Sequence, residues 1–407
     1  MSNKRKKNLL FIYPAMMIGG STTALLSLLN KLDPQKYNID LQLFRNQGPL
    51  IDMIPTHVTL LPPAEMHTGR KGKIIKIVKL FFSGSLFKAF FAGLTSKKKS
   101  ILSRSVLTSF QAKRLSRKNS KHYDCAIGYL EGWSNRYLAF CTHADKKFAW
   151  LHSTFRNITT EPKQELPWMK KVDRIVFVTD ACTQDFQKSM PSMAAKAITI
   201  ENITDCDIVR QRSRIIDAED NEFKVFSTYQ GLRIITVCRL TLNVKGLDRI
   251  VNCAKKMKEA NKPFLWYIIG DGDDKQTISE LIHQHEIENC LILIGKRLNP
   301  YPFIVAADIM CMPSRYEGKP VTVTESMILG TPPIVTKYLS ANEQIQNGVN
   351  GIVVENTDQA IFAPMLNILQ NPSSIKKFCE NLEKMEYENT EIIQATETAL
   401  FGEQGAP

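Results

Sequence analysis

The sequence has no cysteine pattern that indicates a disulfide framework or a zinc site. Its nine cysteines are odd in number, scattered along 407 residues and never spaced as C-x-x-C. We therefore expect reduced thiols, most of them buried, in a cytoplasmic protein. The cysteines predict no metal site.

Long apolar runs are also absent. A membrane-spanning helix needs about 18 to 20 uninterrupted apolar residues, and no stretch of the sequence approaches that length. The basic start, residues 1–7, is followed only by the short run Leu9–Tyr13 before Pro14, without a small-residue cleavage site. We expect neither a transmembrane segment nor a secretory signal.

Acidic residues are missing between His67 and Tyr123. The same stretch holds fifteen Lys and Arg residues, more than the net charge of +13 of the whole chain. The basic character is therefore local, and we assign it to an insertion of about residues 68–122. The cations are Arg70, Lys71, Lys73, Lys76, Lys79, Lys88, Lys97, Lys98, Lys99, Arg104, Lys113, Arg114, Arg117, Lys118 and Lys121.

Short apolar runs alternate with helical patterns in the N-terminal half. Residues 8–13 lack a helical period and precede Gly19-Gly20 and an amphipathic stretch, 21–32, which predicts strand, glycine turn and helix. The pattern predicts a parallel α/β layer that carries the basic insertion. Further strands are expected at 39–44, 123–128, 146–151 and 173–178.

In the C-terminal half, six expected strands alternate with helical patterns, which predicts a doubly wound open sheet. Residues 203–228 are polar and lack a strong period, so we expect a linker there. Strands are expected at 232–238, 264–269, 291–294, 308–312, 333–336 and 352–354, and helices near 246–259, 274–287, 321–329, 340–347 and 358–370.

One motif combines a loop, a helix start and two carboxylates. The segment SRYEGKPVTVTE, residues 314–325, follows a predicted strand and opens a helix near Pro320. The N–H groups at such a helix start suit a phosphate. Glu317 and Glu325 lie before and within that helix, where both can face one ligand. The candidate phosphate loop consists of Gly318, Lys319, Pro320, Val321 and Thr322.

The run SRYEGKPVTVTESMILGTPPIV resembles the signature of retaining GT-B glycosyltransferases of family 4 (glycosyl transferases group 1), of the type that builds bacterial polysaccharides and cell-surface glycans. VCRLTLNVKGLDRIVNCA, YIIGDGDDKQTIS and NGVNGIVVE are similar to three further family segments, in the expected order. The resemblance implies an α/β fold of two Rossmann-like domains that face each other across a cleft. We place the acceptor-binding domain at 1–205, the donor-binding domain at 206–385, and a segment that returns to the first domain at 386–407.

The resemblance also implies roles for single residues. Arg239 and Lys245 match the residues that bind the donor diphosphate, and two cations there make a metal unnecessary. Glu325 matches the glutamate that bonds the ribose hydroxyls, and Glu317 the one that contacts the sugar. The family usually has Gly where this chain has Cys238. Lys245 is expected to open the helix that follows the first strand of this domain.

Three N-terminal residues complete the predicted site. His152 follows strand 146–151 within AWLHS, and its family counterpart approaches the donor sugar. Gly19 and Gly20 allow a close approach of the first helix to the diphosphate, although they do not form the dinucleotide fingerprint G-x-G-x-x-G. Asp271-Gly272-Asp273 resembles a metal-binding triplet of other transferases, but its place after a strand favours a turn.

The resemblance implies transfer of a hexose or N-acetylhexosamine from a nucleotide-sugar, with UDP as the default, to a glycan or lipid-linked acceptor. Retention would follow from front-face attack, with no cofactor beyond the nucleotide-sugar substrate. Three alternatives stay open: a sugar-nucleotide epimerase of the same fold, an inactive sugar-binding subunit, and a non-enzymatic protein whose basic insertion binds nucleic acid or a membrane.

The basic insertion predicts a membrane contact. Residues 74–94 are rich in Ile, Leu and Phe, and Lys73, Lys76 and Lys79 fall along one side if the stretch is helical. We therefore expect residues 70–121 to dock the protein on the inner face of an anionic membrane, without nucleic acid as a partner. The alternative is a solvated basic insertion that has no partner.

Overall fold

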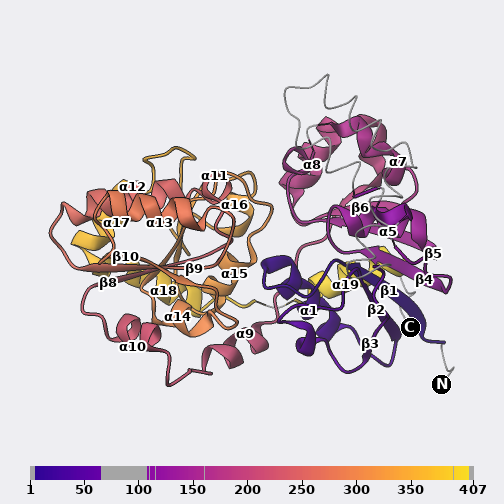
Figure 1. Cartoon of the computed structure of the whole chain (residues 1–407), viewed down its shortest axis with the longest axis horizontal. Coiled ribbons are helices and arrows are strands. Elements are labelled where there is room, and N and C mark those ends of the chain that lie inside the picture. Colours follow the sequence, from indigo (N-terminus) through magenta and orange to yellow (C-terminus); the bar gives the residue numbers. More distant parts are fainter. Residues whose placement is uncertain are drawn as a thin grey trace, which may run out of the picture. The chain divides into compact units, whose positions relative to one another are not determined.

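The computed structural model describes residues 5–65, 108–109, 111–114, 116–159, 161–387 and 389–402. The chain divides into two compact units (Figure 1). The N-terminal unit comprises Met1–Ile203 with Thr390–Pro407, and the C-terminal unit comprises Thr204–Asn389. The two units thus divide near the position that the sequence analysis proposed, residue 205.

The described part of the N-terminal unit contains one seven-stranded sheet, in the order β3-β2-β1-β4-β5-β6-β7. All of its strand pairs are parallel. The expected α/β class is therefore confirmed. The strands are β1 (Lys7–Tyr13), β2 (Tyr37–Leu43), β3 (Val58–Leu60), β4 (His122–Gly128), β5 (His143–Leu151), β6 (Arg174–Phe177) and β7 (Ala197–Thr199).

A C-terminal helix, α19 (Thr390–Phe401), packs on the N-terminal unit at the start of β2. The Tyr37 hydroxyl donates to Glu397 Oε1 at 2.8 Å, and the Tyr37 ring stacks on Phe401 with centroids 5.4 Å apart. The other helices of the unit are α1 (Gly20–Lys31), η1 (Ile51–Met53), α5 (Trp133–Cys141), α6 (Phe155–Ile158), η2 (Pro162–Gln164), α7 (Leu166–Met169), α8 (Asp180–Ser189) and η3 (Pro191–Lys196).

The C-terminal unit contains a six-stranded sheet within its described residues, in the order β10-β9-β8-β11-β12-β13, and its strand pairs are parallel. Helices lie on both faces of this sheet (Figure 1). Both sheets are doubly wound, as expected. The strands are β8 (Leu232–Val237), β9 (Phe264–Ile269), β10 (Leu291–Gly295), β11 (Ile309–Met312), β12 (Pro333–Thr336) and β13 (Ile352–Val354).

The helices of this unit follow its strands in alternation and cover two apolar clusters, one on each side of the sheet. They are α9 (Cys206–Ser213), α10 (Asn221–Thr228), α11 (Leu242–Lys245), α12 (Leu247–Lys258), α13 (Lys275–Gln284), α14 (Tyr301–Ala306), α15 (Val321–Ile328), α16 (Ala341–Gln344), α17 (Phe362–Gln370), η4 (Pro372–Ile375) and α18 (Lys376–Glu383).

The expected linker at 203–228 is wrong, because this segment forms α9 and α10. Asp205 and Asp220 cap the two helices, because each side chain accepts a hydrogen bond from the backbone N–H three residues later, that of Ile208 and that of Phe223. Each helix buries one residue, Val209 in α9 and Phe226 in α10. A single buried contact leaves almost no periodicity in the sequence, which explains the error.

The sequence pattern did not predict two strands of the first sheet. β3 and β7 form its two edges and have three residues each, so their apolar pattern is too short to recognise. Most of the basic insertion, residues 68–107 with positions 110 and 115, lies outside the described residues. The predicted amphipathic stretch 74–94 and its lysines belong to this part.

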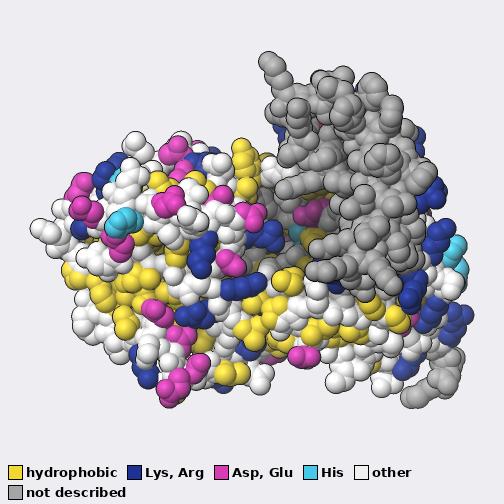
Figure 2. Space-filling model, viewed as in Figure 1, with side chains coloured by type: hydrophobic (Ala, Val, Ile, Leu, Met, Phe, Trp, Pro, Cys, Tyr) yellow, Lys and Arg dark blue, Asp and Glu magenta, His cyan; other side chains and the backbone are white. Residues whose placement is uncertain are grey.

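The nine cysteines are all free thiols, six of them buried, as expected. Among the residues that the structure describes, no helix has both the length and the apolar character needed to cross a bilayer. On the face drawn in Figure 2, Lys and Arg side chains gather over the N-terminal unit, whereas the C-terminal unit shows both signs of charge intermixed.

Candidate active site

The candidate donor residues lie at the carboxyl edge of the second sheet. β8 and β11 are neighbours in this sheet. β9, which follows β8 in the sequence, lies beside β8, and β12, which follows β11, lies beside β11 in the opposite direction along the sheet. The loops after these two strands therefore flank the point at which the strand order reverses. Open α/β sheets bind ligands at this point.

Lys245 and Glu317 meet at this edge. Lys245 Nζ donates to Glu317 Oε1 at 2.6 Å, and Ser314 Oγ donates to the same oxygen at 2.7 Å. Burial lowers the pKa of Lys245, but the charge of Glu317 and its hydrogen bond outweigh burial, and the net pKa is raised. Lys245 therefore keeps its positive charge. Arg239 is exposed and adds a second positive charge, and it lies close enough to oppose the rise in the pKa of Lys245.

Lys245 does not open a long helix, contrary to the sequence analysis. It ends the short helix α11, and Gly246 turns the chain into α12 with a left-handed φ of 64°. A Cβ atom at Gly246 would lie 2.1 Å from the carbonyl oxygen of Pro313. Glycine is thus required at this position, because the turn packs directly on the loop that carries Glu317.

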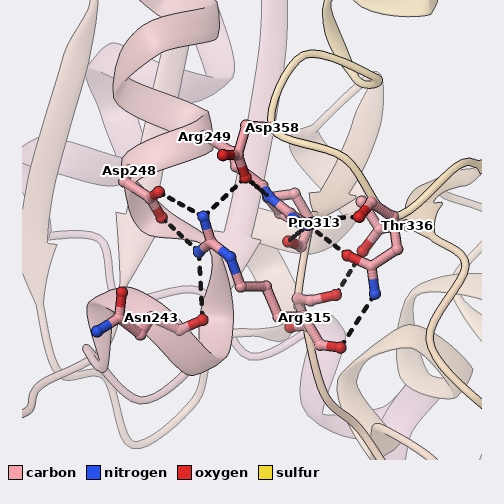
Figure 3. A network of polar contacts seen from close by, with 9 residues as sticks. Asn243, Asp248, Arg249, Pro313, Arg315, Thr336 and Asp358 are labelled. Carbon is pink, nitrogen blue, oxygen red and sulfur yellow. Dashed lines mark hydrogen bonds and ion pairs between the residues drawn. The ribbon is translucent and has the colours of Figure 1, made fainter.

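A network of arginines and aspartates joins the two loops (Figure 3). Arg315 forms a bidentate pair with Asp248 at 2.8 and 2.6 Å and a further bond to Asp358 at 2.8 Å. Arg249 Nε bonds the same Asp358 oxygen at 3.0 Å, and its Nη1 donates to the carbonyl oxygen of Pro313 at 3.1 Å. The guanidinium of Arg315 lies between the two aspartates.

This network was not found by the sequence analysis. Arg315 also donates to the carbonyl oxygen of Asn243 at 3.2 Å, and its backbone N–H donates to Val244 at 2.9 Å. The turn that carries Lys245 is thereby tied to the loop that carries Glu317. The separation of the two functional side chains is set by contacts outside the pair itself.

The phosphate loop Gly318–Thr322 leads into α15 as expected. Ser340 Oγ donates to the carbonyl oxygen of Gly318, and Gln344 Nε2 donates to that of Pro320 at 2.9 Å. Pro320 is the N-cap residue, and no side chain among the described residues caps the helix. The first-turn N–H groups, of Val321 and Thr322, are thus available to an anion. Lys319 is partly exposed beside them.

Glu325 lies inside α15 and is only 3% exposed. Its Oε1 accepts a hydrogen bond of 2.7 Å from the Tyr301 hydroxyl. Burial raises the pKa of Glu325 to about 7, and the bond from Tyr301 and the charge of Arg212 act against this rise. This carboxyl therefore keeps its proton to a higher pH than an ordinary surface glutamate does.

The triplet Asp271-Gly272-Asp273 forms a turn that supports the loop of Arg239. The Leu240 N–H donates to the carbonyl oxygen of Asp271 at 3.0 Å, and the Leu242 N–H donates to Asp274 Oδ2 at 2.7 Å. Within the described residues, no group of three or more His, Cys, Asp or Glu side chains is arranged to hold a metal ion.

His152 directly follows β5, at the carboxyl edge of the first sheet. Its Nε2 lies 3.0 Å from the carbonyl oxygen of Tyr129, so Nε2 carries the proton, because a carbonyl only accepts. Burial lowers the pKa of His152 despite the opposing charge of Glu131, which favours the neutral ring. Nδ1 is then a buried acceptor that bonds no residue the structure describes.

Gly19 and Gly20 lie at the same edge as His152, because β4 alone separates β1 from β5. Gly19 is the N-cap of α1, and its carbonyl oxygen accepts from Thr22 and Thr23 N–H at 3.0 and 3.1 Å. Among the described residues other than its chain neighbours, none has an atom within 4 Å of a Cβ built at Gly19.

Residues 217–387, most of the C-terminal unit, match the family model described as glycosyl transferases group 1. The amylovoran biosynthesis glycosyltransferase AmsK of Erwinia amylovora is 30% identical over 36% of this chain and 38% of its own length. A putative colanic acid biosynthesis glycosyltransferase of Salmonella typhimurium, WcaL, is 30% identical over 32% of this chain and 34% of its own. The match thus spans little more than a third of these relatives.

Similarity in three dimensions extends over both units. The crystal structure of Anabaena HepE in complex with UDP-glucose superposes with a TM-score of 0.67, covering 97% of this chain and 99% of HepE at 13% identity. At this level of identity the likeness establishes the fold, which is the two-domain GT-B architecture expected from the sequence.

Proposed function

We propose that the protein is a retaining glycosyltransferase, because residues 217–387 match the family model described as glycosyl transferases group 1. It would move a hexose or N-acetylhexosamine from a nucleotide-sugar, with UDP as the nucleotide, to a glycan acceptor. The observation that carries the proposal is the pair of Lys245 and Glu317 beside the open start of α15. The UDP-glucose complex of HepE and the polysaccharide-related names of AmsK and WcaL support donor and acceptor class.

The donor diphosphate would take the place nearest the cations. Arg239 and Lys245 would supply two positive charges, and the backbone N–H groups of Val321 and Thr322 would supply donors at the positive end of the helix dipole. Together they neutralise a diphosphate without a metal ion. Glu325 would accept hydrogen bonds from the ribose hydroxyls.

The chemical step would use position and charge rather than a protein nucleophile. The bond from the anomeric carbon to the phosphate oxygen breaks, and the acceptor hydroxyl attacks from the same face, so the configuration is retained. The leaving phosphate oxygen takes the acceptor's proton. Glu317, fixed by Lys245 and Ser314, would bond sugar hydroxyls and stabilise positive charge at the anomeric carbon.

His152 would act on the reacting sugar as a hydrogen-bond acceptor. Its Nδ1 is unprotonated in the neutral ring, as the Nε2 bond to Tyr129 requires. A sugar hydroxyl is the matching donor. Gly19 and Gly20 would complete the donor site through the backbone at the start of α1.

The acceptor would lie at a membrane. We propose that the basic insertion, residues 70–121, holds the enzyme on the inner face of an anionic membrane, with the protein otherwise cytoplasmic. Each cation near such a surface contributes about 1 kcal/mol. Co-sedimentation with anionic and neutral liposomes, for the wild type and a Lys73/Lys76/Lys79→Glu variant, tests this. Unchanged binding of the variant, or binding to nucleic acid alone, would contradict it.

The enzymatic proposal is tested by a thermal-shift panel of UDP-, GDP-, ADP- and CDP-sugars, since a ligand of the native state raises its stability with occupancy. We expect UDP-sugars to give the largest shift. NMR of the product then reports the anomeric configuration. An inverted product would contradict retention, and an epimerised donor in the absence of acceptor would identify a sugar-nucleotide epimerase instead.

A further inference from the structure

Three elements of the C-terminal unit converge on Glu325. The carboxyl itself belongs to α15, the Tyr301 hydroxyl that binds it opens α14, and the guanidinium of Arg212, from α9, lies 5.1 Å from the centre of the Tyr301 ring. α9 and α14 both pack against α15. The contact between Arg212 and Tyr301 places a positive charge over the face of the Tyr301 ring.

The loop before α14 also holds Arg212 and Tyr301 in place. Arg212 Nη2 donates to the carbonyl oxygen of Leu298 at 2.6 Å, and Asn299 Nδ2 donates to the carbonyl oxygen of Arg212 at 2.8 Å. The loop between β10 and α14 is thereby fastened to the end of α9. Tyr301 is 3% exposed, so its hydroxyl has little freedom to leave Glu325.

We propose that Tyr301 and Arg212 are positioning residues for the donor nucleotide, which hold Glu325 as an oriented carboxylate with Oε2 directed to the ribose. This inference rests on the proposed function. Tyr301 keeps its proton, because burial and the neighbouring carboxyl raise its pKa well above the usual value. It can therefore only donate to Glu325 Oε1, and a donor at that oxygen favours the ionised carboxyl.

Donor affinity should consequently depend on pH near neutrality. Among the charged and titratable groups of the described elements packed against α15, Tyr301 and Arg212 are the two that act on the Glu325 carboxyl. Both favour its ionised form against burial. An ionised carboxylate accepts stronger hydrogen bonds from the ribose than a protonated one.

The experiment measures the Kd of UDP-glucose by calorimetry between pH 6 and 9. Both phosphates of this probe are esterified and do not titrate in this range. With the pKa of Glu325 at about 7, the wild type should bind about 10-fold more weakly at pH 6 than at pH 8. Tyr301→Phe should lose about 10-fold at pH 7 and recover at pH 9, and Arg212→Gln should shift the profile in the same direction.

Two controls separate positioning from damage to the fold. Glu325→Gln should bind weakly and independently of pH. Tyr267→Phe removes a similar bond, from Tyr267 to Glu222 at 3.0 Å, and should keep the wild-type profile. If both Tyr301→Phe and Arg212→Gln kept the wild-type dependence of the Kd on pH, this inference would be overturned and the proposed function would stand. Absence of UDP-glucose binding by the wild type at every pH would overturn the proposed donor and the inference with it.

Discussion

The two units differ in where they keep their buried ion pairs. In the N-terminal unit, Arg136 of α5 pairs with Glu165 before α7 at 2.8 Å, and the two side chains are 4% and 3% exposed. In the C-terminal unit, Lys245 and Glu317 pair at the carboxyl edge of the sheet, 19% and 11% exposed. The first pair is enclosed by helices, and the second can be reached from solvent.

The enclosed pair therefore supports the fold, whereas the pair at the sheet edge lies in the candidate site. Arg136 also donates to the Ser109 hydroxyl and the Gly132 carbonyl oxygen, and Glu165 accepts from the Trp168 indole, so among the described residues the bonds of the enclosed pair are to its own surroundings. A pair at the sheet edge can instead exchange partners with phosphate and sugar. The neutral ring of His152 lies at the carboxyl edge of the first sheet, whereas the charged side chains of Lys245 and Glu317 lie at the carboxyl edge of the second.

The largest expected effect is the loss of the enclosed pair. Arg136→Met leaves Glu165 as an uncompensated charge in the interior, so we expect the unfolding free energy of the N-terminal unit to fall by about 3–5 kcal/mol. Urea denaturation followed by circular dichroism measures it. Arg233→Met is the matched control, because its pair with Asp308 is 27% exposed on both sides and contributes about 0–1 kcal/mol. Equal losses in both variants would contradict the comparison.

The edge pair should matter for turnover rather than for folding. If Glu317 contacts the reacting sugar as proposed, Glu317→Ala should lower kcat by about 100- to 1000-fold. If Glu325 contacts the ribose as proposed, Glu325→Ala should mainly raise KM for the donor. Steady-state kinetics with a UDP-sugar distinguish the two. Wild-type kinetics in both variants would refute the site assignment.

The arginine network should show an intermediate effect. Arg249→Met removes the donors to the Pro313 carbonyl and to Asn356, which costs about 1–3 kcal/mol of stability. The cost is below that of Arg136→Met because Asp358 is 67% exposed and regains water. Thermal unfolding with and without UDP-sugar measures both stability and donor binding. A loss as large as that of Arg136→Met would mean that the network is as enclosed as the N-terminal pair.

The neutral ring of His152 predicts a modest pH effect on stability. Its pKa is lowered in the folded chain, so between the ordinary value of about 6.5 and the folded value only the unfolded chain takes a proton. Stability is then lost as pH falls below about 6.5, at no more than about 1.4 kcal/mol per pH unit. The slope should be smaller in His152→Gln. Equal slopes would indicate a charged ring and remove the contrast between the two edges.

The smallest expected effect is that of chelation, which should leave activity unchanged. In the proposed donor site, Arg239, Lys245 and the start of α15 balance the diphosphate without a metal ion, so EDTA should have no metal to remove. The assay compares rates with EDTA and with added manganese. Loss of activity on chelation with rescue by manganese would move the metal and donor chemistry to Asp271 and Asp273.

Much of the architecture was predictable because buried strands appear as apolar runs. Where a run was long enough, as at Phe264–Ile269, the strand was placed correctly. The same rule fails for three-residue edge strands and for α9 and α10, which bury one side chain each. A short helix that buries one side chain has no recognisable hydrophobic period in its sequence.

The sequence by itself determined the doubly wound α/β class, the free thiols and the loops that end at the carboxyl edges of the sheets. It also singled out Lys245 and Glu317, each from its own motif. Only the tertiary structure decided that these two residues, 72 positions apart, bond each other. It also decided that Arg249 and Arg315 fix their loops and that Tyr301 faces Glu325. Ion pairs between distant residues leave no spacing in a sequence, because they depend on which strands become neighbours.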